Sequence, residues 1–114
     1  MSAITTHILD TSLGLPGAGV RVVLERETHP ADWQEVADGT TDEDGRINDL
    51  LSVDEVFPLG HYRLVFNTGA YFLMRDIECF FPQITISFVV KDENQHYHVP
   101  LLLSPFGYST YRGS

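Results

Sequence analysis

The sequence predicts a single domain, residues 1–114, folded as an antiparallel β-sandwich. Short stretches that alternate apolar and polar residues recur about every 8–12 residues, with turn residues between them, as is typical of a sandwich. Only one stretch has helical spacing, and strands do not alternate regularly with helices, so a parallel sheet is not expected. The prediction is therefore an all-β domain with one short helix.

The first half of the chain is expected to hold four strands. The loop 11–19 is rich in glycine and proline, and the segments 28–32 and 42–45 carry the aspartate, proline and glycine that favour turns. The expected strands are 4–10, 20–27, 33–41 and a brief one within 46–50.

The second half is expected to hold three or four more strands and the helix. Ser52 and Glu55 match a capping box, so 51–60 is interpreted as a loop that could hold a helical turn. The helix is placed within 67–81, with Thr68 as its cap and its end before Pro82. The expected strands are 61–66, 84–92, 96–104 and 107–113.

Charge and composition exclude several classes of protein. The net charge is −9, which argues against binding to nucleic acid or to anionic membranes. No basic and apolar leader and no long apolar run occurs, so a cytoplasmic location is expected. The single cysteine, Cys79, rules out an intramolecular disulfide and is expected to be a buried free thiol.

Histidine and arginine are the candidates for chemistry. Along 96–104, Tyr97 and its alternate neighbours are apolar and form the core face, so His98, Pro100 and Leu102 point out of the core towards a contact surface or pocket. His7 lies within a strand, either on a wet outer face or in a site.

Other readings of the same residues stay open. His96 and His98 have the two-residue spacing of a metal pair, but no third ligand follows at a recognisable spacing. Arg46, which leaves a tight turn, and Arg112 could each form a surface ion pair or, beside histidines, hold an electron-rich ligand. His29 and His61 are interpreted as solvated surface residues.

Three motifs in order along the chain resemble one family. The ending "HYHVPLLLSPFGYSTYRGS", the start "THILDTSLGLPGAG" and the central "TTDEDGRI" are similar to those of the transthyretin-like 5-hydroxyisourate hydrolases. The resemblance implies a transthyretin-like sandwich of two four-stranded antiparallel sheets, with a short helix late in the chain. It also implies a homotetramer, a dimer of dimers, whose active sites lie at the dimer–dimer interface.

The resemblance further implies hydrolysis of the cyclic amide of 5-hydroxyisourate to 2-oxo-4-hydroxy-4-carboxy-5-ureidoimidazoline in urate breakdown, with no metal and no cofactor. The implied catalytic residues are His7, Arg46, His98 and Ser114. We expect His98 to activate water, His7 to assist, Arg46 to orient and stabilise, and Ser114 to polarise the site through its hydroxyl or terminal carboxylate. The residues expected to contact substrate are Tyr111, Arg112, Gly113, Pro100 and Leu102.

Two alternatives are weighed against this hydrolase. Transthyretin shares the implied fold and carries thyroid hormone in the corresponding channel, but it lacks the two histidines, the arginine and the Y-R-G-S ending. A structural or adhesive sandwich module would explain the strands but not the combination of His7, Arg46, His98 and "YRGS".

Overall fold

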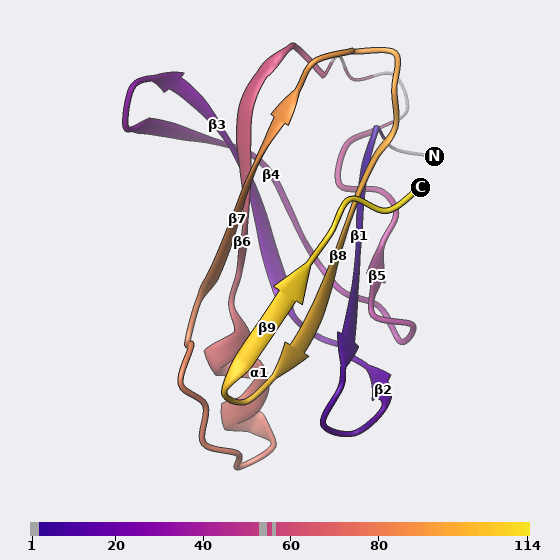
Figure 1. Cartoon of the computed structure of the whole chain (residues 1–114), viewed down its shortest axis with the longest axis vertical. Coiled ribbons are helices and arrows are strands. Elements are labelled where there is room, and N and C mark those ends of the chain that lie inside the picture. The colour runs from indigo at the N-terminus through magenta and orange to yellow at the C-terminus, as the bar shows by residue number, and fades with distance from the viewer. Residues whose placement is uncertain (1–2, 53–54, 56) are drawn as a thin grey trace.

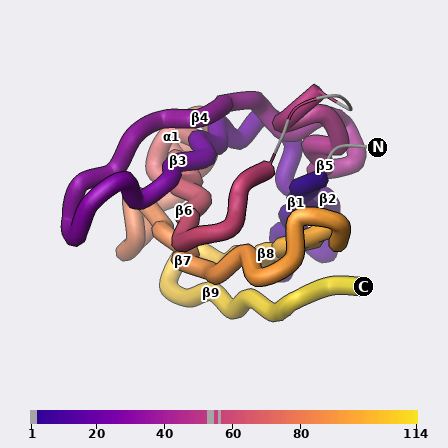
Figure 2. Tube along the Cα trace, turned by 90° about the horizontal axis from the view of Figure 1, so that it is seen from above, coloured from indigo at the N-terminus to yellow at the C-terminus, as the bar shows by residue number. Residues whose placement is uncertain are grey.

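The computed structural model describes residues 3–52, 55 and 57–114 as two facing β-sheets with one short helix (Figures 1 and 2). The first sheet has the order β2-β1-β8-β9, with β5 also paired to β1, and the second has the order β4-β3-β6-β7. The strands of the first sheet are β1 (Ile4–Asp10), β2 (Leu15–Pro16), β5 (Arg46–Ile47), β8 (Tyr97–Ser104) and β9 (Gly107–Thr110). Those of the second are β3 (Arg21–His29), β4 (Asp32–Thr40), β6 (Gly60–Phe66) and β7 (Ile84–Val90).

The core lies between the two sheets and follows from strand alternation. Every second residue of β8, from Tyr97 to Leu103, is buried, as the sequence predicted. These side chains belong to the same buried cluster as Ile4 and Ile8 of β1 and as Val22 and Leu24 of β3. The inward faces are thus fully used for packing, and the outward face of β8 is left for other roles.

The all-β sandwich with one helix is confirmed, with two refinements of the strand pairing. β1 and β8 run parallel, with Ile4 opposite Tyr97 and Asp10 opposite Leu103. A parallel neighbour is compatible with this order because the chain crosses to the other sheet and back between them. The two-residue strands β2 and β5 both pair with β1, so the first sheet has five strands rather than four.

The helix is shorter than predicted. α1 spans Thr68–Met74, and Asn67 rather than Thr68 caps it by accepting a hydrogen bond from the Ala70 N–H. The Thr68 hydroxyl instead donates to the Phe81 carbonyl oxygen at 2.7 Å, which ties the helix start to the segment before β7. Cys79 lies beyond the helix and is half-buried rather than buried.

The last strand is also shorter than predicted. β9 ends at Thr110, and the chain continues without a ladder until an isolated bridge pairs Gly113 with His98. In Figure 1 the C-terminal segment runs to the same end of the molecule as the start of β8. The final residues therefore return to the strand that carries His98.

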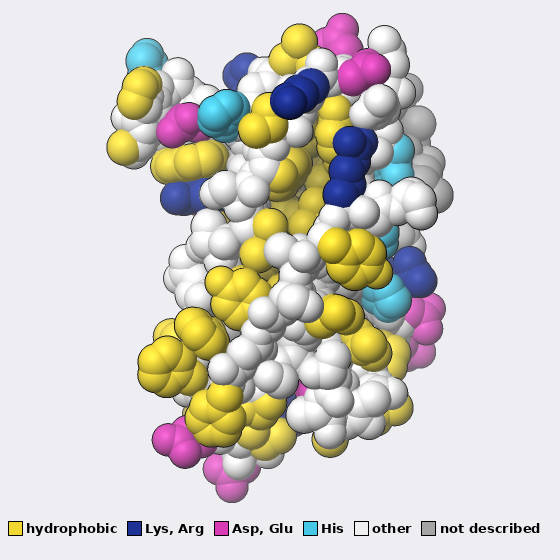
Figure 3. Space-filling model, in the orientation of Figure 1, with side chains coloured by type: hydrophobic (Ala, Val, Ile, Leu, Met, Phe, Trp, Pro, Cys, Tyr) yellow, Lys and Arg dark blue, Asp and Glu magenta, His cyan; other side chains and the backbone are white. Residues whose placement is uncertain are grey.

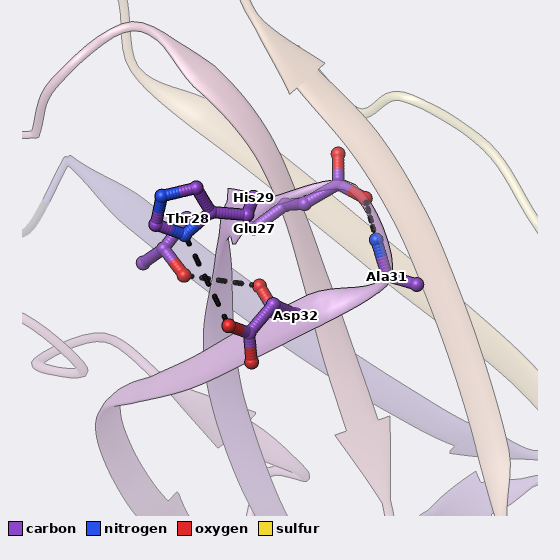
Figure 4. Close-up of polar contacts among 5 residues, drawn as sticks. All are labelled: Glu27, Thr28, His29, Ala31 and Asp32. Atoms are coloured by element: carbon purple, nitrogen blue, oxygen red, sulfur yellow. Dashed lines mark hydrogen bonds and ion pairs between the residues drawn. The ribbon is translucent and has the colours of Figure 1, made fainter.

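The turn between β3 and β4 shows how surface histidines behave in this chain (Figure 4). His29 lies 3.9 Å from the Asp32 carboxylate, and both side chains are mostly exposed. Ala31, at φ 64°, donates its N–H to the Glu27 carboxylate at 3.2 Å. His29 is thus a solvated turn residue, as predicted, and the exposed His61 beside Glu27 is similar.

Two further sequence predictions concern the loop 51–60 and membrane-spanning segments. The Ser52 N–H donates to the Glu55 carboxylate at 2.9 Å, but the rest of the possible helical turn lies on 53–54 and 56, outside the described residues. Within the part of the chain that the structure describes, no helix is long and apolar enough to cross a membrane.

Candidate active site

Strand register brings three of the predicted catalytic residues to one outer face. His7 on β1 is the direct partner of Arg46 on β5 and of Pro100 on β8, and Thr5 is the partner of His98. Directly opposed residues share a face of a sheet, so His7, Arg46 and His98 all project away from the core. Figure 3 shows histidine and basic side chains along this side of the molecule.

Arg46 is presented by a turn that depends on a glycine. Gly45 has φ +74°, and a Cβ there would collide with the Ile8 carbonyl oxygen of β1. The turn is closed by Asp42, whose carboxylate accepts the Arg46 N–H at 3.0 Å. The guanidinium itself is exposed and forms no ion pair with any described residue. The backbone is therefore fixed while the charged group remains available to a ligand.

His98 is held from two sides. Its Nδ1 lies 2.8 Å from the Thr5 hydroxyl, and its carbonyl oxygen accepts the Gly113 N–H at 2.8 Å. A Cβ on Gly113 would collide with the imidazole ring of His98 and would lie 3.3 Å from Pro100. Glycine is thus required at position 113 because the C-terminal segment crosses directly over this ring.

The surroundings keep His98 neutral. Burial lowers its pKa from the ordinary 6.5, and the positive charges of Arg46, His96 and His7 lower it further. A hydrogen bond with the Thr5 backbone raises the His98 pKa but does not outweigh these effects. A half-buried imidazole that stays neutral at neutral pH is suited to accept a proton.

The other predicted residues lie around this cluster in different ways. Pro100 is buried beside Gly113, and Leu102 is half-buried on the same face of β8. Arg112 turns away from His98, stacks over the Tyr97 ring at 4.7 Å and donates to the Gln95 side chain at 2.9 Å.

A hollow lies beside the C-terminal segment, and His98 is among the residues that line it. It encloses about 240 Å³ between β7, the start of β8 and residues 110–112, and Tyr111 and Arg112 line it. His98 therefore borders this hollow together with Tyr111 and Arg112, while His7 and Arg46 do not line it. The predicted substrate contacts of Tyr111, Arg112 and Gly113 and the predicted catalytic role of Ser114 stay predictions.

Sequence reasoning missed one neighbour of His98. Thr5 is buried on the outer face and touches both His98 and His96, whose Nε2 lies 3.0 Å from the Thr5 hydroxyl. The alternation that placed His7 on the outer face also placed Thr5 there, but only the pairing of β1 with β8 reveals the contact. Among the described residues, no group of three metal-ligating side chains gathers around the His96–His98 pair.

This arrangement combines the parts needed to hydrolyse an amide. A neutral histidine can remove a proton from water, and a guanidinium can hold an oxygen that becomes negatively charged. The second histidine, His7, lies between them in the sheet. Fold and site together define a transthyretin-like sandwich with a cationic, histidine-containing outer face.

Comparison with known proteins identifies the family. The model of the HIUase/Transthyretin family matches residues 4–113, and the chain belongs to this family. The 5-hydroxyisourate hydrolase of Salmonella dublin is 48% identical over 111 residues, which cover 97% of this chain and 80% of that protein. The mouse (Mus musculus) 5-hydroxyisourate hydrolase is 44% identical over 99% of this chain and 96% of its own length.

Solved structures include both branches of the family. Klebsiella pneumoniae 5-hydroxyisourate hydrolase is 40% identical, has a TM-score of 0.85 and aligns over 97% of this chain and 98% of that chain. Sea bream transthyretin in complex with thyroxine is 33% identical, has a TM-score of 0.91 and aligns over 98% of this chain and 95% of that chain. Backbone similarity is high to both, so the fold does not decide the function and the site must.

Proposed function

We propose that this chain is a 5-hydroxyisourate hydrolase that opens the cyclic amide of 5-hydroxyisourate to 2-oxo-4-hydroxy-4-carboxy-5-ureidoimidazoline. The observation that carries the proposal is the convergence of His7, Arg46 and His98 on one outer face. Full-length relatives at 44–48% identity that are named 5-hydroxyisourate hydrolase support it. The reaction belongs to urate breakdown, within purine degradation.

The proposed mechanism uses His98 as the base. Neutral His98 takes a proton from water, and the water oxygen forms a bond to the amide carbonyl carbon. The carbonyl oxygen gains negative charge and is held by Arg46, whose planar donors suit an oxyanion. The C–N bond then breaks and His98 returns the proton to the leaving nitrogen, which leaves a carboxylic acid and a ureido group. The carboxylic acid then loses its own proton to water and becomes a carboxylate. His7 assists by orienting substrate or by sharing the proton transfer.

The remaining predicted residues complete the pocket in this proposal. Gly113 and Pro100 form a close wall against the His98 ring, and Leu102 extends the apolar part of that wall. Ser114 polarises the site, while Tyr111 and Arg112 contact substrate from the C-terminal segment.

We further propose a homotetramer with its sites at the dimer–dimer interface. Within the described part of the chain, β7 and β9 are each the last strand at one side of their sheet, so each leaves one edge free for pairing. Phe106, Tyr108, Leu13 and Leu15 are large apolar side chains that stay exposed in the single chain. Light scattering after size exclusion tests this assembly, and a monomer at micromolar concentration contradicts it. The cytoplasmic location stays a prediction.

A carrier function is the second candidate, favoured by the similarity to thyroxine-bound transthyretin. One assay separates the two functions. 5-Hydroxyisourate is generated from urate with urate oxidase, purified chelator-treated protein is added, and the absorbance decay is followed. Decay well above the spontaneous rate is expected. No acceleration by folded protein, together with thyroxine binding, would favour the carrier.

A further inference from the structure

One buried hydroxyl lies against two imidazoles on the outer face of β1. The Thr5 side chain is 2% exposed, and its oxygen lies 2.8 Å from His98 Nδ1 and 3.0 Å from His96 Nε2. The two rings stack at a centroid distance of 6.4 Å and an interplanar angle of 17°. Thr5 is therefore a bridge between a half-buried histidine and an exposed one.

The single proton of the Thr5 hydroxyl limits which ring nitrogens it can bond at the same time. A hydroxyl has one proton to donate and can accept from other donors, so the two ring nitrogens cannot both be bare acceptors. If His98 donates its Nδ1 proton to Thr5, Thr5 is free to donate its own proton to His96 Nε2. In that arrangement Nε2 of His98 is unprotonated, which is the state that a base needs.

The surrounding charges favour this direction. The groups near His98 are His7 of β1, Arg46 of β5 and His96, which directly precedes β8. Gly113 covers the ring, and its neighbours in the sequence are Arg112 and Ser114. A positive charge on His98 is disfavoured there, because its ring is half-buried and because Arg46, His96 and His7 lie near it. His96 is exposed and can hold that charge in contact with water.

We propose that Thr5 and His96 are positioning residues that act through His98 as a hydrogen-bonded relay; this inference rests on the hydrolase function proposed above. When His98 takes the water proton at Nε2, its Nδ1 proton moves to the Thr5 oxygen, and the Thr5 proton moves to His96 Nε2. His98 is neutral again, Thr5 is unchanged and His96 carries the charge. The reverse transfers supply the proton that the leaving nitrogen takes from His98.

Matched variants separate the relay from simple structural support. Thr5→Val removes the hydroxyl at nearly constant shape, and Thr5→Ser retains it. Thr6→Val is the control, because Thr6 is also buried on β1 but its hydroxyl donates only to the Val99 carbonyl oxygen at 2.7 Å. His96→Gln can still accept the Thr5 proton but cannot take on a positive charge, and His29→Gln controls for loss of an exposed histidine.

The kinetic expectations differ between these variants. Thr5→Val lowers kcat at least about tenfold with little change in KM, because the base loses the group that orients it. Thr5→Ser restores kcat to within about threefold of the parent, since its hydroxyl can bridge the same rings. His96→Gln lowers kcat and moves the acidic limb of kcat/KM to higher pH, because a charge that lowers the His98 pKa is gone. His29→Gln changes neither.

Three kinetic results would overturn the relay. One is an equal loss in Thr5→Val and Thr6→Val with unshifted pH profiles. Another is a failure of Thr5→Ser to recover activity in folded protein. The third is a His96→Gln profile that coincides with that of the parent. Thermal melting of each variant confirms that the comparison is made on folded protein.

A readout on the free protein keeps this test independent of the reaction. In ¹⁵N-histidine NMR at neutral pH, His98 is expected to carry its proton on Nδ1 in the parent and in Thr6→Val, and to lose this preference in Thr5→Val. If the parent does not accelerate decay but the tautomers behave as expected, the hydrolase proposal fails and the hydrogen-bonded bridge stands. If the parent is active and His98 carries its proton on Nε2 instead, the relay fails and the hydrolase stands.

Discussion

The outer faces of the two sheets carry similar charged and aromatic residues but use them differently. On the second sheet the charges are paired across strands. Arg63 of β6 lies 2.5 Å from the Glu25 carboxylate of β3 and stacks over Trp33 of β4 at 4.3 Å. Arg21 similarly pairs with Asp38 across β3 and β4. Each cation on this face is matched by an anion or by an aromatic ring.

On the outer face of β1, β5 and β8, the guanidinium of Arg46 and the nearby histidines form no ion pair with any described residue. Burial lowers the His98 pKa, and Arg46, His96 and His7 each lower it further. In a chain of net charge −9, such a concentration of positive groups does not arise from composition. A structural surface and a candidate site therefore differ in whether their charged side chains have partners, and not in which residue types they contain.

Apart from loss of the base itself, the largest loss of activity is expected when the exposed guanidinium of Arg46 is removed. Arg46→Ala should lower kcat/KM at least about a hundredfold, the size typical for loss of a donor to a developing oxyanion. Arg46→Lys should recover only part of the activity, because an ammonium lacks the planar paired donors. The decay assay measures both variants, and parent-like activity of Arg46→Ala would remove Arg46 from the mechanism.

Crowding of His98 should produce the next largest effect. In Gly113→Ala the new methyl group collides with the His98 ring, so the ring must move. We expect roughly a tenfold loss in kcat/KM, since misplacement of a base by a fraction of an ångström weakens proton transfer. Gly14→Ala is a control variant, because a Cβ at Gly14 meets nothing within 4 Å, although its φ of +68° brings backbone strain. Equal activity of parent and Gly113→Ala would contradict the close approach.

The surroundings of His98 show which parts of the site could be predicted from the sequence alone. Strand alternation predicted the core face of β8 and the outward direction of His98, because both depend only on local periodicity. It could not predict that Thr5 lies opposite His98, since the parallel pairing of β1 with β8 joins residues far apart in the chain. The requirement for glycine at 113 likewise depends on which strand the C-terminal segment crosses.

The helix was predicted to end too late for a similar reason. Spacing suggested a helix that continued towards Pro82, but Leu73 and Met74 are 78% and 86% exposed, so the last turn buries nothing. Asp76 then adopts a positive φ of 56°, and the following residues pack against the core as an extended segment. Tertiary packing, which the sequence pattern does not show, ends the helix early.

A moderate effect is expected in the pH dependence. The pKa of His98 is lowered from 6.5, first by burial and then by the charges around it, so the base stays neutral to lower pH than an ordinary histidine. The acidic limb of kcat/KM should therefore have an apparent pKa below 6.5, with activity retained above it. Stopped-flow decay rates across pH 5–8, roughly the range in which histidines titrate, measure it. A limb centred above 6.5 would contradict this assignment.

A stability effect away from the site should come from a buried pair. The Tyr71 hydroxyl donates to the Asp10 carboxylate at 2.6 Å, and Asp10 is fully buried. Tyr71→Phe leaves that oxygen without this donor and should cost about 1–3 kcal/mol of unfolding free energy. Chemical denaturation measures it, and an unchanged midpoint would contradict the pairing.

The same pair predicts a stability change at high pH. Burial, together with Asp10, raises the pKa of Tyr71 from 10.0 to about 12. The unfolded chain therefore loses this proton first, and stability should fall as pH rises from 10 through about 12. Tyr71→Phe should remove this part of the decline, and an identical decline in both proteins would contradict the assignment.

The smallest effect is expected on the paired face. Arg63→Gln breaks the contact with Glu25 and weakens the stacking on Trp33, and should change stability by no more than about 1 kcal/mol because the pair is partly exposed. Its kcat/KM should equal that of the parent. A large loss of activity in Arg63→Gln would contradict the claim that only the outer face of β1, β5 and β8 takes part in the reaction.

The most direct test of the account compares one histidine from each face. His98→Asn and His61→Asn are assayed for 5-hydroxyisourate decay beside the parent. We predict that His98→Asn loses about 10²–10⁴-fold in kcat/KM, the range for loss of a general base, while His61→Asn keeps the parent's rate. Full activity of folded His98→Asn would contradict the assignment of the chemistry to the outer face of β1, β5 and β8.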